Sequence, residues 1–128
     1  MKIRQSVTFN APPHEVYEAL MDSKKHEAFT RDKAHISRKP GGTFTAYGGY
    51  ITGKNLELYE DEKIVQLWRT DEWPEGHFST VTYRLKDLHG STKLTFTQDG
   101  IPEEFCESIR KGWHEYYWRP LKKLLEGR

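Results

Sequence analysis

One stretch decides the fold of this chain: GIPEEFCESIRKGWHEYYWRPLKKLLEGR, residues 100–128. A glycine and a proline open it, acidic residues follow at once, and basic residues gather near its end, which is the charge distribution that the helix dipole favours. We therefore predict one long helix that is opened by residues 100–104 and runs to the C-terminus.

One broad face of this helix is apolar and aromatic. At about 100° per residue, with Cys106 beside it, the face carries Phe105, Ile109, Gly112, Trp113, Tyr116 and Tyr117. Trp118 falls on the opposite side with His114 and Leu125. Pro120 removes a helical hydrogen bond and bends the axis. Two alternatives follow for Trp118: burial against the first strand or the short helices, or partial exposure as a contact for a partner protein.

Gly112 interrupts that face. A glycine in mid-helix costs about 1 kcal/mol relative to alanine, so it needs a reason. Either the helix approaches a strand closely at this point, or the missing side chain leaves a gap that a ligand fills.

The spacing of apolar residues changes twice in the N-terminal part of the chain. Residues 3–9 alternate between apolar and polar, apart from Gln5, as a half-buried strand does. The Ala-Pro-Pro segment at 11–13 then starts a helix of about ten residues. Asp22 and Ser23 can cap a second short helix that ends at Phe29. Residues 31–39 are polar, and a Pro-Gly-Gly segment ends them.

The middle of the chain predicts antiparallel strands joined by short turns. Gly48 and Gly49 supply the positive φ of a hairpin turn between residues 43–47 and 50–53. Further strands are predicted at 56–60, 63–70, 78–86 and 92–98. The fold class is therefore α+β: a curved antiparallel sheet of six or seven strands around the long C-terminal helix, with two short helices after the first strand. We expect one domain, residues 1–128, with a cavity where the sheet and the helix fit imperfectly.

The composition excludes several classes of function. The net charge is +1 with 30% charged residues, so no global field attracts nucleic acid. The N-terminus has no apolar run long enough for a signal peptide or a membrane span, which predicts a cytoplasmic location. Cys106 is the single cysteine and cannot form an intrachain disulfide.

Four segments carry a resemblance to a known family: a Trp68-led segment with Trp-Pro-Glu-Gly-His-Phe at 73–78, Gly-Ser-Thr-Lys-Leu-Thr at 90–95, Gly-Ile-Pro at 100–102 and Gly-Trp-His-Glu-Tyr-Tyr-Trp-Arg-Pro-Leu-Lys at 112–122. In this order they resemble the activator of Hsp90 ATPase homologue 1 (AHSA1) family. The opening Ala-Pro-Pro-His-Glu-Val-Tyr-Glu-Ala-Leu at 11–20 is similar to the wider START-like, or helix-grip, superfamily. Together they cover nearly the whole chain.

The resemblance implies two functions. Superfamily members commonly hold lipids, sterols, polyketides or other apolar molecules under the long helix, and a few perform chemistry there. Within the family, the chain resembles the second domain of a eukaryotic co-chaperone, which contacts the amino-terminal regions of dimerised Hsp90. The sequence offers no counterpart of that co-chaperone's first domain. The resemblance therefore implies binding to an Hsp90-type chaperone more directly than stimulation of its ATPase.

The residues give little support to catalysis. None of the six histidines has a paired metal-ligand spacing, so we predict no metal and no cofactor. Cys106 near His77 or His114 is better explained as a core cysteine than as a nucleophile beside a base. The acids at 71, 72 and 75 share a loop, where water solvates charges. An enzyme of the cyclase or hydrolase type is the weakest of three interpretations.

We predict a non-enzymatic binding domain that holds a small hydrophobic ligand between sheet and C-terminal helix. The predicted lining is Phe44, Trp68, Trp73, His77, Phe78, Tyr83, Ile109, Gly112, Trp113, Tyr116 and Tyr117. His77 either anchors the ligand by a hydrogen bond or caps its loop and stacks on Trp73.

The alternative is an Hsp90-type chaperone regulator of the stress response. Such a protein would dock through a face that includes Trp118, Lys24, Lys25, Arg31 and Lys33. The basic residues can equally form a solvated face. We expect neither nucleic acid nor a membrane as partner.

Overall fold

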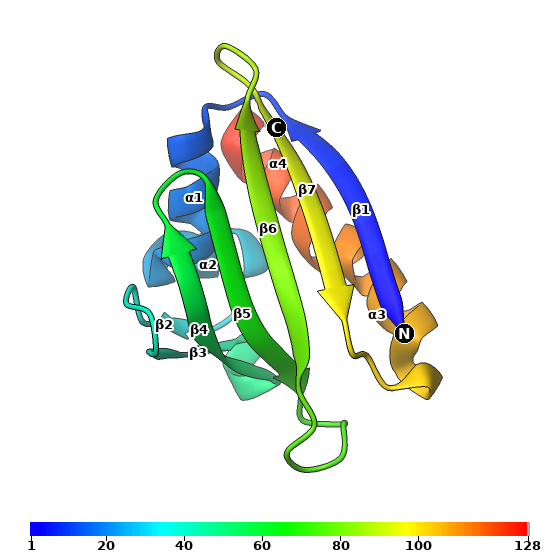
Figure 1. The fold of residues 1–128 in the computed structure, drawn as a ribbon. Coiled ribbons are helices and arrows are strands. Elements are labelled where there is room, and N and C mark those ends of the chain that lie inside the picture. The colour runs from blue at the N-terminus through cyan, green and yellow to red at the C-terminus, as the bar shows by residue number, and fades with distance from the viewer. Residues whose placement is uncertain (128) are drawn as a thin grey trace.

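A seven-stranded antiparallel sheet forms the frame of the molecule. The structure, a computed structural model, describes residues 1–127. The strands lie in the order β1-β7-β6-β5-β4-β3-β2, with the bounds β1 Lys2–Phe9, β2 His35–Ile36, β3 Thr43–Ala46, β4 Ile51–Tyr59, β5 Lys63–Thr70, β6 Ser79–Asp87 and β7 Thr92–Asp99. Figure 1 shows this curved sheet with all of the longer helices on one of its faces. The predicted helix-grip fold is confirmed.

The two short helices follow β1 as the sequence predicts. Helix α1, Pro13–Met21, begins with a proline in its first turn, and α2, Ser23–Thr30, has Asp22 as its N-cap. The Asp22 carboxylate accepts a hydrogen bond from the Lys25 backbone N–H at 3.0 Å, which satisfies one of the free donors of the first turn.

The C-terminal helix consists of several segments on one axis. A 3₁₀ turn, η2 (Glu103–Phe105), leads into α3, Cys106–Trp113; a π-helical segment, η3 (His114–Trp118), follows, and α4, Arg119–Glu126, completes it. The helix runs behind β6, β7 and β1 (Figure 1). No helix within residues 1–127 is long and apolar enough to cross a membrane.

Two details of the sheet differ from the sequence prediction. The segments predicted at 50–53 and 56–60 form one strand, β4, because a bulge between Asn55 and Glu57 lets the strand continue past the interruption in its pattern. The short strand β2 lies in the polar segment 31–39 and pairs with β3 through His35↔Thr45 and Ile36↔Phe44. Two residues are too few to produce a period-2 signal.

The predicted position of Trp118 on the far face is wrong. Its side chain is 2% exposed and stacks on Trp113, with ring centroids 5.4 Å apart and planes inclined by 22°. Residues five apart in an α-helix point about 140° away from each other, whereas the i→i+5 bonding of a π-helix brings them onto the same side. The π segment η3 therefore turns Trp118 toward the sheet, and its indole Nε1 donates to Gln5 Oε1 at 2.7 Å. Burial against the first strand, one of the two alternatives, is what the structure has.

Trp113 ties the helix to the middle of the sheet. Its ring lies within 4.3–6.1 Å of the rings of Trp68, Tyr83, Phe96 and Tyr117. Its Nε1 donates to Gln98 Oε1 at 2.7 Å, and the Gln98 amide donates to Ser79 Oγ at 2.9 Å. A buried polar chain thus runs from the helix into β7 and β6, and it fixes how high the helix sits above the sheet.

Candidate functional site

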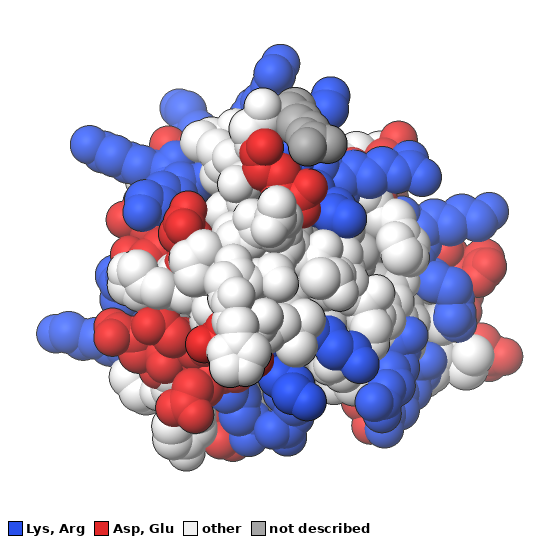
Figure 2. Space-filling model, turned by 90° about the horizontal axis from the view of Figure 1, so that it is seen from above, with Lys and Arg blue, Asp and Glu red and all other residues white. Residues whose placement is uncertain are grey.

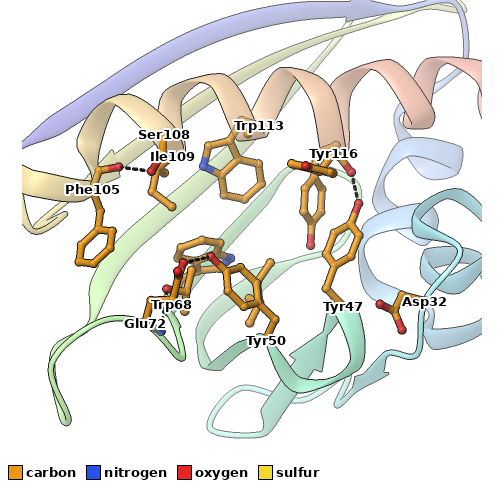
Figure 3. A pocket seen from close by; sticks show the side chains of 14 residues that line it. Asp32, Tyr47, Tyr50, Trp68, Glu72, Phe105, Ser108, Ile109, Trp113 and Tyr116 are labelled. Atoms are coloured by element: carbon orange, nitrogen blue, oxygen red, sulfur yellow. Dashed lines mark hydrogen bonds between the residues drawn. The ribbon is translucent and has the colours of Figure 1, made fainter.

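A cavity of about 600 Å³ lies between the C-terminal helix and the β3–β4 end of the sheet. This volume is in the range of small-molecule sites, roughly 300–1,000 Å³. Figure 3 shows α3 and η3 above it and the β3–β4 and β5–β6 connections below. Half of the fourteen lining residues are aromatic; the full lining is Asp32, Tyr47, Tyr50, Ile51, Trp68, Thr70, Glu72, Phe105, Ser108, Ile109, Gly112, Trp113, Tyr116 and Tyr117.

Tyr47 closes one side of the cavity. It has a φ of 51°, the left-handed region that a tyrosine seldom adopts, and such strain persists where the surroundings hold it. Its hydroxyl donates to the backbone carbonyl of Tyr116 (Figure 3). Pro120 has no N–H for that carbonyl, which is four residues earlier, so the proline leaves an acceptor that Tyr47 uses. The proline of the helix and the wall of the cavity are therefore connected.

The mouth carries polar groups. The Tyr50 hydroxyl donates to the Glu72 carboxylate at 2.5 Å. Burial first, and then this hydrogen bond, raise the pKa of Tyr50 to about 12, so the phenol keeps its proton at neutral pH. Glu72, Asp32 and Ser108 are exposed, which places them where the cavity meets solvent.

The inner wall is made of indole rings. Trp68 on β5 and Trp113 on α3 are 4% and 2% exposed, and their ring centroids lie 5.4 Å apart. Tyr117 continues this wall at 4.6 Å from Trp113. Trp68 and Trp113 thus meet where the sheet and the helix close.

Gly112 leaves open space in the cavity. A Cβ added there would meet one side-chain atom, Tyr116 Cδ2, at an ordinary 3.8 Å. At Gly53, by contrast, an added Cβ would lie 2.0 Å from the Leu67 carbonyl oxygen and 2.4 Å from the Phe44 ring. A neighbouring backbone therefore leaves no room for a side chain at Gly53 on β4. Close packing of the helix on the sheet does not explain Gly112.

The structure brings six of the eleven predicted lining residues to the cavity: Trp68, Ile109, Gly112, Trp113, Tyr116 and Tyr117. Phe44 and Tyr83 are buried behind Trp68 and Tyr117, around a void of about 10 Å³, which holds one water at most. They share this void with Trp68 and Tyr117, and they do not line the larger cavity.

The other three predicted lining residues lie at the β5–β6 connection, outside the cavity. Trp73 packs edge-on against Trp68 at 5.5 Å. His77 Nε2–H donates to the Gly100 carbonyl oxygen at 2.7 Å, and the His77 ring lies 5.8 Å from the Trp73 ring. The structural alternative for His77 is therefore the one found. Phe78 is 42% exposed and lies under the Arg69 guanidinium.

Several lining residues were not predicted. Tyr47 and Tyr50 flank the Gly48-Gly49 pair, and two large aromatic residues around a glycine turn were a signal for a binding wall. Asp32 and Glu72 belong to loops whose place beside the helix depends on the whole sheet, so the sequence offered no signal for them.

The basic residues of the predicted partner face are on the surface. Lys24 and Lys25 on α2, and Arg31 and Lys33 after it, are all exposed. Seen from above, basic and acidic side chains alternate around the periphery of the molecule, with uncharged residues in the middle (Figure 2). That view shows no field of a single sign. A partner role for these residues stays a prediction.

The described residues hold no group of three or more histidine, cysteine or acidic side chains placed to bind a metal. Cys106 is buried, and its sulfur lies 3.7 Å from an Arg110 nitrogen, so the thiol belongs to the packing of the helix.

Comparison with known proteins gives a consistent picture. The activator of 90 kDa heat shock protein ATPase homolog 1 of Homo sapiens is 35% identical over 124 residues, which are 97% of this chain and 37% of that protein. The Hsp90 co-chaperone AHA1 of Saccharomyces cerevisiae is 29% identical over 121 residues, 90% of this chain and 35% of that protein. The chain thus spans just over a third of the length of these relatives.

Solved structures share the fold. The crystal structure of PFC0360w, an HSP90 activator from Plasmodium falciparum, superposes with a TM-score of 0.92 at 26% identity and covers 99% of this chain and 96% of that chain. The crystal structure of CalU16 from Micromonospora echinospora has a TM-score of 0.83 at 21% identity, with 97% and 75% covered, and shows likeness of fold alone. The family model for activator of Hsp90 ATPase homolog 1-like protein matches residues 10–126, and with these relatives it shows that the chain belongs to that family.

Proposed function

We propose that this protein binds a small apolar molecule in the cavity beneath its C-terminal helix, without transforming it. The observation that carries the proposal is the cavity of about 600 Å³ with an aromatic wall. Apolar surface moved out of water stabilises a complex by roughly 25 cal/mol per Å² before the costs of association. We expect the protein to work in the cytoplasm.

The pre-formed wall supports this proposal. Trp68, Trp113 and Tyr117 are held by ring contacts and by the Gln98 hydrogen bond, so little side-chain freedom remains to be lost on binding. Mid-helix Gly112 lowers helix stability by about 1 kcal/mol and leaves space at the cavity. A stability cost at the site itself fits a binding role better than a purely structural one.

A panel of neutral apolar compounds and lipids tests the proposal. Binders should raise the melting temperature by mass action and change tryptophan fluorescence, because Trp68 and Trp113 line the cavity. A broad panel in which no compound changes either signal would contradict the proposal.

Replacing Gly112 by leucine should separate folding from binding. Gly112 lines the cavity and an added Cβ would meet no close contact. We therefore expect an intact fold, stability equal to or up to about 1 kcal/mol above that of the unchanged protein, and at least tenfold weaker binding of a panel compound, a change of about 1.4 kcal/mol. Melting curves and fluorescence titrations measure both.

Lys111→Leu is the matched control. It introduces the same side chain on the same helix at an exposed position outside the lining, so binding should not change. Loss of folding in Gly112→Leu, or unchanged binding, would contradict the assignment of the cavity.

A second function is favoured by the relatives. We infer from the names of the two relatives, which are 35% and 29% identical, that this chain also contacts an Hsp90-type chaperone, with the exposed Lys24 and Lys25 in the contact. Charge reversal at both should weaken binding about three- to tenfold, mainly through the association rate. The measurement is the shift of amide resonances as the chaperone is added.

The control reverses Lys86 and Lys93, which face each other across β6 and β7 and are also exposed. Equal loss in both double variants would remove α2 from the interface. No amide shift in the unchanged protein would remove the interaction.

A further inference from the structure

The charge of the cavity lining has one sign. Of the fourteen lining residues, the charged ones are Asp32 and Glu72, and the lining contains neither lysine, arginine nor histidine. A ligand that carries a carboxylate or a phosphate would find no cation in this wall and would meet two like charges. The lining therefore selects against anionic apolar molecules, such as fatty acids.

Both carboxylates keep unused acceptor capacity. Glu72 accepts the Tyr50 hydroxyl, and Asp32 accepts the Lys33 backbone N–H at 2.8 Å. The four ion pairs found within residues 1–127 involve neither of them. Each carboxylate has about four lone-pair sites, so each can accept from a ligand without giving up its present bond. Arg31, the chain neighbour of Asp32, is not part of the lining either.

Electron-rich rings lie in the same wall as the two carboxylates. Tyr47 and Tyr116 meet edge to face at 5.9 Å, and Tyr50 holds Glu72 through its hydroxyl. A cation is attracted to the face of an aromatic ring within about 6 Å of its centre, and more strongly where water is partly excluded. Figure 3 shows Tyr47, Tyr50 and Tyr116 across the cavity, with Asp32 and Glu72 toward its two ends.

The wall between these ends is apolar. Trp68 and Trp113 are both less than 5% exposed and offer no charge. The part of a bound molecule that lies against this wall must therefore be apolar, while an end that reaches Glu72 meets a carboxylate and ring faces. Such a cavity fits an amphipathic cation.

We propose that the cavity takes an apolar molecule that ends in an amine or a quaternary ammonium group. The cationic end lies at the mouth beside the Glu72 carboxylate and the tyrosine rings, with Asp32 at the other end adding to the negative charge of the lining, and the apolar part lies against Trp68 and Trp113. This inference rests on the proposed ligand-binding function and adds the class of ligand to it.

Three probes of similar size test the inference: benzyltrimethylammonium, its uncharged carbon analogue neopentylbenzene, and the anion 3-phenylpropanoate. Titration followed by tryptophan fluorescence and by the indole resonances gives the dissociation constant of each. We expect the ammonium probe to bind at least about tenfold more tightly than the uncharged analogue, and the anion to bind most weakly.

Two isosteric substitutions locate the preference. Glu72→Gln combined with Asp32→Asn removes both charges and keeps an oxygen for the Tyr50 hydroxyl. The double variant should bind the ammonium probe about tenfold more weakly and the uncharged analogue with unchanged affinity, a difference that a general loss of structure would not produce. Glu75→Gln, in the same loop as Glu72 but outside the lining, is the control and should change neither.

The outcomes separate this inference from the function on which it rests. Equal binding of the ammonium probe and its uncharged analogue, or preference for the anion, overturns the cationic assignment and leaves the cavity as a binding site. If none of the three probes binds while neutral compounds of the panel do, the cationic assignment is again overturned. If no compound of any class binds, both proposals fail.

Discussion

Replacing Trp113 by alanine is expected to lower the free energy of unfolding by about 4 kcal/mol. The ring is 2% exposed and contacts the rings of Trp68, Phe96 and Trp118, among others, and truncating a buried tryptophan typically costs about 3–5 kcal/mol. Urea unfolding followed by far-UV circular dichroism measures the change. A loss below about 1 kcal/mol would mean that the helix is not fixed to the sheet at this residue.

The contribution of the Trp113 hydrogen bond to stability can be separated from that of its buried surface. Trp113→Phe removes the Nε1 donor and leaves Gln98 Oε1 buried without its partner, which costs roughly 1–3 kcal/mol beyond the lost area. Trp73→Phe is the matched control, because Trp73 is also buried, while its Nε1 has no hydrogen-bond partner among the described residues. We expect Trp113→Phe to lose about 1–3 kcal/mol more stability than Trp73→Phe. Equal losses in the two variants would contradict a stabilising role of the Gln98 contact.

Acidification should destabilise the protein through His26. This side chain is 5% exposed, and its Nε2 pairs with the Tyr117 hydroxyl at 3.0 Å. Burial lowers the pKa of His26 from 6.5 to about 4, while the backbone carbonyls of Leu20 and Ala19 act in the opposite direction. The folded state therefore holds fewer protons than the unfolded state between these two values. Stability is fully present above pH 6.5 and is lost as the pH falls toward 4.

The size of this loss is about 3 kcal/mol, at 1.36 kcal/mol per pKa unit between 6.5 and about 4. Urea unfolding at several pH values, compared with His26→Gln, isolates it from the titration of other groups. The variant should show a loss smaller by about that amount. His14→Gln serves as control. A hydrogen bond with Asp61 raises the pKa of the exposed His14, so removing His14 cannot reduce the loss of stability at low pH. Parallel curves for His26→Gln and the unchanged protein would contradict the assignment.

Local signals in the sequence explain most of the fold. The strand at 63–70 has the predicted bounds, because turn residues mark both of its ends. Asp22 caps α2 as predicted, because an N-cap needs one side chain and the backbone beside it. The charge distribution and the apolar face of residues 100–128 were sufficient to predict a long helix on the sheet.

Features that depend on distant residues were not predictable. A helical wheel drawn at about 100° per residue misplaced Trp118, because the π segment η3 has a different number of residues per turn. The hydrogen-bond partner of the Trp118 indole, Gln5, is also far away in the chain. The cavity mouth shows the same limit. Tyr50 and Glu72 meet only because β4 and β5 pair in one register, Ile51↔Thr70. Phe44 was predicted to line the cavity, whereas its depth behind Trp68 depends on the packing of the whole core.

The central claim is that the cavity beneath the C-terminal helix is a binding site. Its most direct test is a nuclear Overhauser spectrum of the protein with the tightest compound of the panel. We predict intermolecular contacts from the compound to the side-chain protons of Trp68, Trp113 and Tyr117, and none to Trp73. A compound that binds but shows no contact to these three rings would contradict the claim.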